Sequence, residues 1–134
     1  MSLVVDASLV VAALADSGPI GTWAEGVLEE DDLAAPHLLP VEAANILRRS
    51  SASGALSVDQ AAPAHADLLH LHVELFPYAP FGRRVWQLHQ NLTAYDAWYV
   101  ALAESLHAPP ATLDLRVMRS PGPTCAFRTP PSAA

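Results

Sequence analysis

The sequence predicts an α/β fold in which a parallel sheet of about four to five short strands carries helices on both faces. Two observations support this prediction. Short apolar, β-branched runs alternate with helix-like segments along the 134 residues, and no internal repeat or long linker interrupts the alternation. Parallel strands need crossover connections, which are right-handed and place helices against the sheet.

In the first half of the chain, local signals mark where helices begin and end. Ser8 is placed to cap a helix, and Pro19 suits a first helical turn, where its missing N–H costs nothing. Gly54 marks a helix end, and Ser57 with Gln60 resembles a capping box. These signals predict strands at 3–5 and 33–35 and helices at 8–15, 19–30, 39–53 and 57–69, the last with a kink or a late start at Pro63.

In the second half, the clearest element is a helix that begins near Thr93, with Asp96 three residues later and a periodic apolar set beyond. Pro110 cannot donate to a sheet ladder, so the strand that begins there is expected to be short. The predicted strands are 73–76, 111–113 and 124–127, and the predicted helices are 81–88, 93–107 and 116–120. Residues 1–128 then form a single domain, and the tail 129–134, rich in Pro and Ala, is expected to be disordered.

Composition excludes several classes of protein. All seven basic residues are arginine, so a P-loop hydrolase is excluded, and a receiver-type phosphoacceptor domain would lack its usual lysine. The single Cys125 cannot form an internal disulfide, and the N-terminus does not resemble a signal peptide. No apolar run approaches the roughly 20 residues of a membrane span. We therefore expect a cytoplasmic protein that does not enter a membrane.

Four carboxylates lie within apolar stretches at the points where strands end or helices begin: Asp6, Glu42, Asp96 and Asp114. Ligands of parallel α/β sheets bind beyond the carboxyl ends of the strands, so the fold would gather these acids around one crevice. Gathered carboxylates repel one another unless a cation neutralises them, and oxygen ligands favour Mg²⁺ or Mn²⁺. This predicts a metal site suited to phosphodiester hydrolysis, in which all four acids act as catalytic or metal-binding residues.

Each acid also has a local explanation. Asp96 could complete a cap with Thr93, and Glu42 could be an acid that the helix dipole favours in a first turn. Asp6 and Asp114 could hold turns. The four together, in this order along the chain, are much less expected by chance. Glu104 is too far from Asp96 to share an ion, at roughly 12 Å along one helix.

The net charge of −7 argues against a protein that binds nucleic acid through a broad basic face. The arginines nevertheless occur in local pairs. Arg48 with Arg49, and Arg83 with Arg84, are candidates for contact with phosphates, although they are weak ones because surface arginine is common in any protein. A zinc site at His65, His70 and His72 is disfavoured, since no cysteine joins them.

The segments VVDASLVVAAL, PHLLPVEAANILRR, LTAYDAWYVALAESL and TLDLR resemble the PIN domain, specifically the VapC toxins of type II toxin-antitoxin systems. The resemblance covers nearly the whole chain. It implies a three-layer α/β/α sandwich and a Mg²⁺-dependent endoribonuclease, with Mn²⁺ as a possible substitute. It also implies a cognate VapB-type antitoxin and a homodimer. The family's acids map onto the four above, with polar support expected from Ser8, Asn45, Thr93 and Thr112.

One departure from the family pattern leaves alternatives open. Some relatives carry a further acid shortly after the fourth, where this chain has Leu115 and Arg116, so one ion rather than two is plausible. A catalytically impaired binding module that acts through its antitoxin or RNA partner is the main alternative. A phosphatase is a weaker one, since Asp6-Ala7-Ser8 lacks a second aspartate. The expected substrate of an active enzyme is structured RNA, such as tRNA or rRNA, cut in a single-stranded loop.

Overall fold

The computed structural model describes residues 2–30 and 32–131. Its strands are β1 (Ser2–Val5), β2 (Asp32–Pro36), β3 (Glu74–Phe76) and β4 (Pro110–Ala111). Its helices are α1 (Ala7–Ala15), α2 (Pro19–Glu30), α3 (Leu39–Ala52), α4 (Val58–Leu69), the 3-10 turn η1 (Ala79–Phe81), α5 (Gly82–Gln87), α6 (Ala94–Leu106) and α7 (Leu115–Arg119). The alternation predicted from the sequence is confirmed. Of the tail expected to be disordered, residues 132–134 lie outside the described part.

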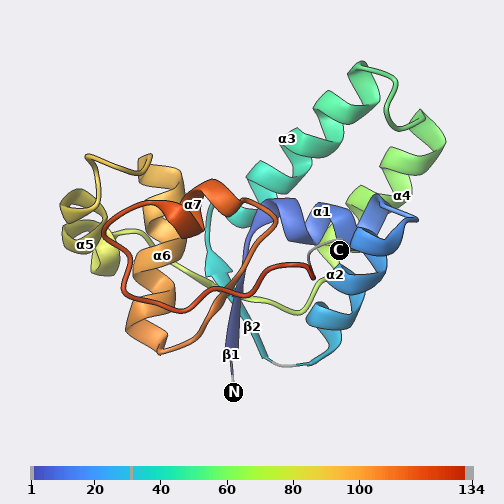
Figure 1. Cartoon of the computed structure of the whole chain (residues 1–134). Helices are drawn as coiled ribbons and strands as arrows, with labels where there is room; N and C mark the ends of the chain where they lie inside the picture. Colours follow the sequence, from blue (N-terminus) through green and yellow to red (C-terminus); the bar gives the residue numbers. More distant parts are fainter. Residues whose placement is uncertain (1, 31, 132–134) are drawn as a thin grey trace.

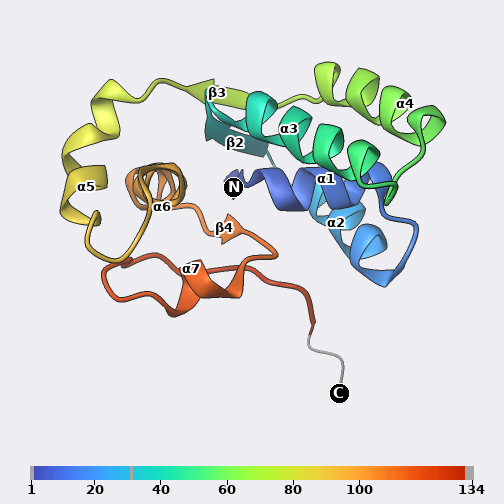
Figure 2. The ribbon, with the colours of Figure 1, turned by 90° about the horizontal axis from the view of Figure 1, so that it is seen from above.

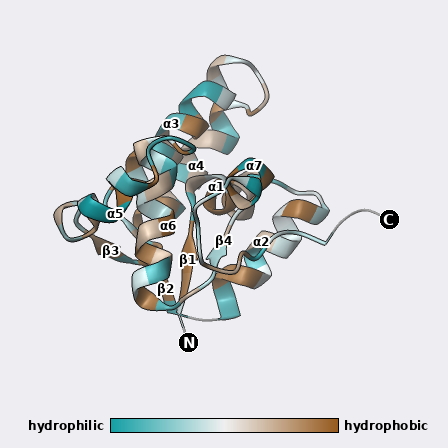
Figure 3. Ribbon diagram, turned by 60° about the vertical axis from the view of Figure 1, so that its left-hand side comes forward, coloured by the Kyte–Doolittle hydropathy of each residue, from teal (hydrophilic) through white to brown (hydrophobic). Residues whose placement is uncertain are grey.

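The strands form one parallel four-stranded sheet in the order β3-β2-β1-β4. The central strand β1 pairs on both sides: Val4 lies opposite Ala34 of β2 and Pro110 of β4. Leu3, Val4 and Val5 are all buried, as expected of a parallel strand covered on both faces. Figure 3 shows the hydrophobic colouring of β1 in the interior of the molecule.

Helices cover the sheet from two sides. Helices α1 to α4 gather on one side of the strands, and α5 and α6 lie on the other (Figures 1 and 2). Helix α6 packs on β1 and β2, with Leu102 fully buried against the sheet. The result is a three-layer α/β/α sandwich, as predicted.

The C-terminal edge of the sheet differs from the prediction. Strand β4 has two residues instead of 111–113, and 124–127 does not form a strand. Only a parallel bridge between Ala111 and Arg128 extends the sheet there. Pro123 and Pro130 have no N–H to donate, and the N–H of Thr124 bonds to Glu104 instead of a strand. The N–H of Thr124 is thereby unavailable to a sheet ladder, and the segment pairs with the sheet at Arg128.

The positions at which two helices begin differ in detail from the sequence prediction. The N-cap of α1 is Asp6, whose carboxylate accepts from the N–H of Leu9, so Ser8 lies inside the helix and is not its cap. The capping box of Ser57 and Gln60 is present, and α4 runs from Val58 through Pro63 without the late start considered above. Pro63 is the sixth residue of α4, so the helix continues past a position that has no N–H to donate. No helix in the described part is long and apolar enough to cross a bilayer.

Candidate active site

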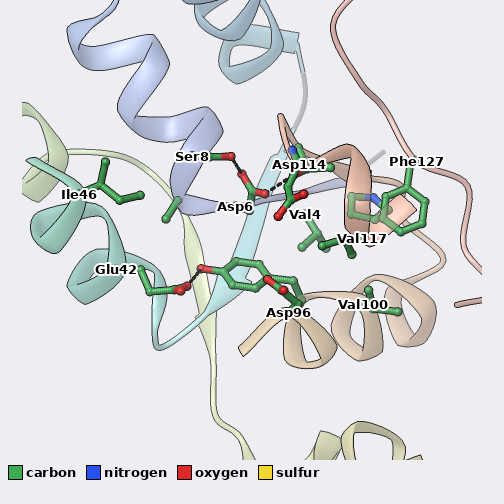
Figure 4. Close-up of a pocket in the computed structure, with 14 residues that line it drawn as sticks. Val4, Asp6, Ser8, Glu42, Ile46, Asp96, Val100, Asp114, Val117 and Phe127 are labelled. Atoms are coloured by element: carbon green, nitrogen blue, oxygen red, sulfur yellow. Dashed lines mark hydrogen bonds between the residues drawn. The ribbon is translucent and has the colours of Figure 1, made fainter. Parts of the chain in front are cut away.

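A pocket of about 140 Å³ lies where β1 and β4 end. Figure 1 shows β1 rising from the N-terminus toward the starts of α1 and α3, with α7 beside them. The polar residues that line the pocket are Asp6, Ser8, Glu42, Asp96, Tyr99, Thr112 and Asp114. Figure 4 shows the four carboxylates around this one cavity, with Val4, Val100, Val117 and Phe127 among its apolar walls. The structure therefore brings together acids that are up to 108 residues apart in sequence (6 to 114).

Asp6 is the most firmly held of the four acids. One carboxylate oxygen accepts from Ser8 Oγ at 2.8 Å and from the N–H of Leu9 at 3.0 Å. The other accepts from the hydroxyl of Thr112. Burial raises the pKa of Asp6 above its ordinary value, although these three hydrogen bonds oppose the rise. Its carboxylate is thus fixed in orientation but short of a compensating positive charge.

Glu42 lies in the first turn of α3 and is held by a residue of α6. Tyr99 donates its hydroxyl proton to Glu42 Oε1 at 2.7 Å. Burial raises the pKa of Glu42 in spite of this hydrogen bond, and the negative charges of Asp96 and Asp6 raise it further. Burial and the neighbouring Glu42 also raise the pKa of Tyr99, which stays protonated as a donor.

Asp96 lies in the first turn of α6, which begins after Thr93. The N–H of Asp96 donates to Thr93 Oγ1 at 3.2 Å, so Thr93 caps the helix as predicted. This cap fixes the backbone of Asp96, whose side chain lines the pocket. Burial raises the pKa of Asp96, and the negative charge of Asp114 adds to the effect.

Asp114 differs from the other three because it has a cationic partner. It caps the short helix α7, and its N–H donates to Thr112 Oγ1 at 2.9 Å. Its two carboxylate oxygens accept from Arg116, Oδ1 from Nε at 3.2 Å and Oδ2 from Nη2 at 3.0 Å. This guanidinium holds the pKa of Asp114 below its ordinary value. Thr112, which bonds to both Asp6 and Asp114, joins the two acids.

The donor set fits a hard divalent cation in its chemistry. Carboxylate oxygens are the ligands that Mg²⁺ and Mn²⁺ prefer, and burial raises the pKa values of Asp6, Glu42 and Asp96. Among the described residues, however, no three His, Cys, Asp or Glu side chains form a ready-made metal site. Asp6, Glu42, Asp96 and Asp114 line one pocket without yet being drawn together around a single point.

Of the four polar residues expected to support the acids, three contact an acid or cap its helix and one does not. Ser8 and Thr112 bond directly to Asp6, and Thr93 caps the helix of Asp96. Asn45 instead lies exposed, where its side-chain oxygen accepts from Arg48 Nε at 3.0 Å. It is not among the described residues that line the pocket, because the α3 position that reaches the cavity is Ile46.

None of the four arginines proposed for phosphate contact lines the pocket in the described part of the chain. Arg48 bonds to Asn45, and Arg49 and Arg83 are exposed. Arg84 forms an ion pair with Glu104 at 2.7 Å and also donates to the carbonyl oxygen of Gly122 at 2.9 Å. This contact network ties the segment after α7 to α6.

Two residues of the site escaped the sequence analysis. Tyr99 was not singled out, although its position three residues after Asp96 places both on one face of the helix. Arg116 was noted only as a residue that stands where some relatives have a further acid. Its position two residues after Asp114, at the start of a short helix, was the available signal.

Comparison with known sequences gives the family. The model of the PIN domain matches residues 3–121. This chain belongs to the PIN domain family, in its VapC branch. It is 41% identical over 126 residues to "Ribonuclease VapC1" of Mycobacterium tuberculosis, covering 93% of this chain and 95% of the relative. It is 35% identical over 129 residues to "Ribonuclease VapC9" of the same species, covering 96% and 98%.

Solved structures of low sequence identity share the fold. PAE2754 from Pyrobaculum aerophilum has a TM-score of 0.70 at 22% identity, covering 96% of this chain and 83% of that one. VapBC2 from Rickettsia felis, bound to a promoter DNA fragment, has a TM-score of 0.65 at 14% identity, covering 96% and 98%. VapC20 of M. tuberculosis, described as a toxin that cleaves the sarcin-ricin loop, has a TM-score of 0.60 at 16% identity, covering 79% and 84%.

Proposed function

We propose that this VapC-family protein is a Mg²⁺-dependent endoribonuclease, the toxin of a toxin-antitoxin module, and that it acts in the cytoplasm. The observation that carries the proposal is the convergence of Asp6, Glu42, Asp96 and Asp114 on one pocket at the carboxyl end of the sheet. Relatives at 41% and 35% identity that are named ribonucleases support the reaction class. Mn²⁺ is expected to substitute for Mg²⁺, because both take oxygen ligands.

The four acids would hold the cation, which when bound would neutralise charge on the scissile phosphate and activate a water molecule. The protein's own groups do the positioning. Ser8, Leu9 and Thr112 fix the Asp6 carboxylate through three hydrogen bonds. Glu42 lines the pocket with a pKa that burial raises, and Tyr99 orients its carboxylate. We assign Glu42 to proton removal from the attacking water.

For the substrate, we propose a structured RNA, such as tRNA or rRNA, cut in a single-stranded loop. Unpaired bases can be splayed out and read, whereas the deep groove of an RNA helix hides them. The VapC20 structure, described as that of a sarcin-ricin loop cleaving toxin, is one precedent for such a target on this fold. A cognate VapB-type antitoxin and a homodimer complete the proposal, supported for the antitoxin by the VapBC2 complex.

The alternative is a PIN-fold binding module that has lost catalysis. The observation that favours it is Arg116, which stands where some relatives have a further acid and whose guanidinium engages Asp114. Such a module would bind its antitoxin or RNA without cutting.

A cleavage assay on the purified protein separates the two. Structured RNA is incubated with Mg²⁺, Mn²⁺ or EDTA and with wild type, Asp6→Ala or Asp96→Ala. Cutting that needs the metal and is lost in both variants is the expected result. Equal cutting by the variants would point to a contaminating nuclease, and absent cutting with tight antitoxin binding would favour the binding module.

A further inference from the structure

Arg116 is an exposed cation attached to the edge of the acidic pocket. The ion pairs among the described residues join Arg84 to Glu104, Arg128 to Glu30 and Arg116 to Asp114, and of these only the last involves a pocket acid. The contact is bidentate, with donor to acceptor distances of 3.0 and 3.2 Å. Both oxygens of Asp114 therefore face the guanidinium of Arg116.

The pair is well placed to exchange partners. The Arg116 side chain is 90% exposed and that of Asp114 is 26% exposed. The two residues lie two positions apart, at the start of the five-residue helix α7, so their contact is local. Ion pairs of this kind are weak, because water solvates both partners well.

The ion pair of Arg84 and Glu104, in contrast, is held in place by several further hydrogen bonds. Glu104 is 13% exposed, and besides Arg84 it accepts from the N–H and the hydroxyl of Thr124. Arg84 also donates to Gln87 and to the carbonyl of Gly122. This pair spans 20 residues and anchors the C-terminal segment, so its guanidinium is not available to a ligand. Arg116 has no such set of further side-chain acceptors among the contacts of the described residues.

The negative charge of the pocket would oppose the binding of RNA, and Arg116 is placed to offset it. Asp6, Glu42 and Asp96 line the same pocket as Asp114, and the chain carries a net charge of −7. An acidic pocket repels the phosphates of RNA. A positive side chain at its edge would attract them, provided that a pocket carboxylate does not already neutralise it.

We propose that Arg116 couples the cation content of the pocket to the binding of RNA phosphate. Without a divalent cation, Arg116 neutralises Asp114. A cation competes for the Asp114 carboxylate, and the guanidinium that it releases binds a phosphate of the RNA beside the pocket. The proposal rests on the function proposed above and makes Arg116 a phosphate-binding and positioning residue for that site.

Thermodynamic linkage gives the first test. If Arg116 competes with the cation, Arg116→Gln should bind Mg²⁺ more tightly than wild type does. The matched control is Arg119→Gln, which removes the same charge from an exposed position of the same helix, where the residue makes none of these contacts with Asp114. Calorimetric titration with Mg²⁺ is expected to show tightening by roughly two- to fivefold for Arg116→Gln, the range expected for one exposed ion pair, and less for Arg119→Gln.

The second test measures RNA binding without relying on cleavage. A fluorescent single-stranded RNA is titrated with each protein in EDTA, in Mg²⁺ and in Ca²⁺, and a denaturing gel checks that the RNA remains intact. Wild type and Arg119→Gln should bind more tightly when the cation is present. Arg116→Gln should lose most of that gain, because the guanidinium that the cation would release is gone.

The outcomes separate this inference from the proposed function. If neither wild type nor the variants bind Mg²⁺, the proposed metal site itself is wrong. If wild type binds Mg²⁺ and Arg116→Gln binds it no more tightly than Arg119→Gln does, the competition is refuted while the metal site stands. Cation-dependent RNA binding that survives in Arg116→Gln would likewise refute the release of Arg116 to phosphate. Circular dichroism melting of both variants confirms that each is folded.

Discussion

Asp6 and Asp114 follow neighbouring strands of one sheet and line one pocket, yet their surroundings are opposite. Asp6 receives three hydrogen bonds from Ser8, Leu9 and Thr112, and burial raises its pKa. Asp114 is at the rim, where Arg116 lowers its pKa. The comparison shows that the fold fixes the inner acid and leaves the outer acid able to change partners. A cation site can thus be preorganised on one side and adjustable on the other.

The largest expected effect is the loss of RNA cleavage on removal of the inner acid. Asp6→Asn should lower the rate by at least about a hundredfold, because a bound metal supplies several kcal/mol of stabilisation to the transition state. Asp114→Asn should lower it less, since this carboxylate already shares its charge with Arg116. Single-turnover rates on one RNA measure both variants. A larger loss for Asp114→Asn would reverse the assignment of inner and outer acid.

Thr112→Val tests the link between the two acids. Valine keeps the shape of the buried threonine, which is 4% exposed, but it removes the hydroxyl that donates to Asp6 and accepts from the N–H of Asp114. We expect a loss of about 1 to 3 kcal/mol in the free energy of unfolding, as for buried groups that lose their hydrogen bonds, and cleavage slowed by roughly ten- to a hundredfold. Urea unfolding and single-turnover cleavage measure the two. Thr112→Ser, which keeps the hydroxyl, should retain most of the activity.

Tyr99→Phe extends the comparison to the third acid, Glu42. The change keeps the buried ring of Tyr99 and removes its hydrogen bond to Glu42 Oε1. Cleavage should slow by about tenfold, the lower end of the range for a residue that orients a metal ligand or base. The rate against pH should also shift, because Glu42 loses the hydrogen bond that opposes the rise of its pKa. An unchanged pH profile would mean that Tyr99 only packs.

The smallest expected effect concerns stability against pH in the absence of metal. The pKa of Asp6 is raised on folding, so the stability that it contributes is present below its unfolded pKa of 3.8 and is lost as pH rises through the folded pKa. The melting temperature of Asp6→Asn relative to wild type should therefore increase with pH above that value. Asp114 has a lowered pKa, and its contribution is present above 3.8 and lost as pH falls.

Asp114→Asn should accordingly show the opposite trend and lose stability relative to wild type as pH rises to about 4, its ordinary titration range. The effect should be small, because Asp114 lies at the solvent-exposed rim. Differential scanning fluorimetry in EDTA across this pH range measures both variants. Parallel trends in the two would show that the contrast between the inner and outer acid does not hold.

Much of the fold could be predicted from local signals. The apolar run of β1, the capping box of Ser57 and the Thr93 cap each depend on neighbouring residues, and all three are confirmed. The C-terminal edge was predicted wrongly, because whether 124–127 pairs as a strand depends on distant Glu104, which takes the N–H of Thr124. The sequence near 124–127 does not indicate that a distant carboxylate accepts this hydrogen bond.

The sequence alone determined the α/β alternation and which four acids lie at strand ends and helix starts. Those positions are set by contacts over a few neighbouring residues. Which carboxylate is buried, which is paired with Arg116 and which is held by Tyr99 was decided only by the tertiary structure. Burial and ion pairing depend on atoms brought together across the sheet. These environments, and not the residue types, set the charge and mobility of each acid.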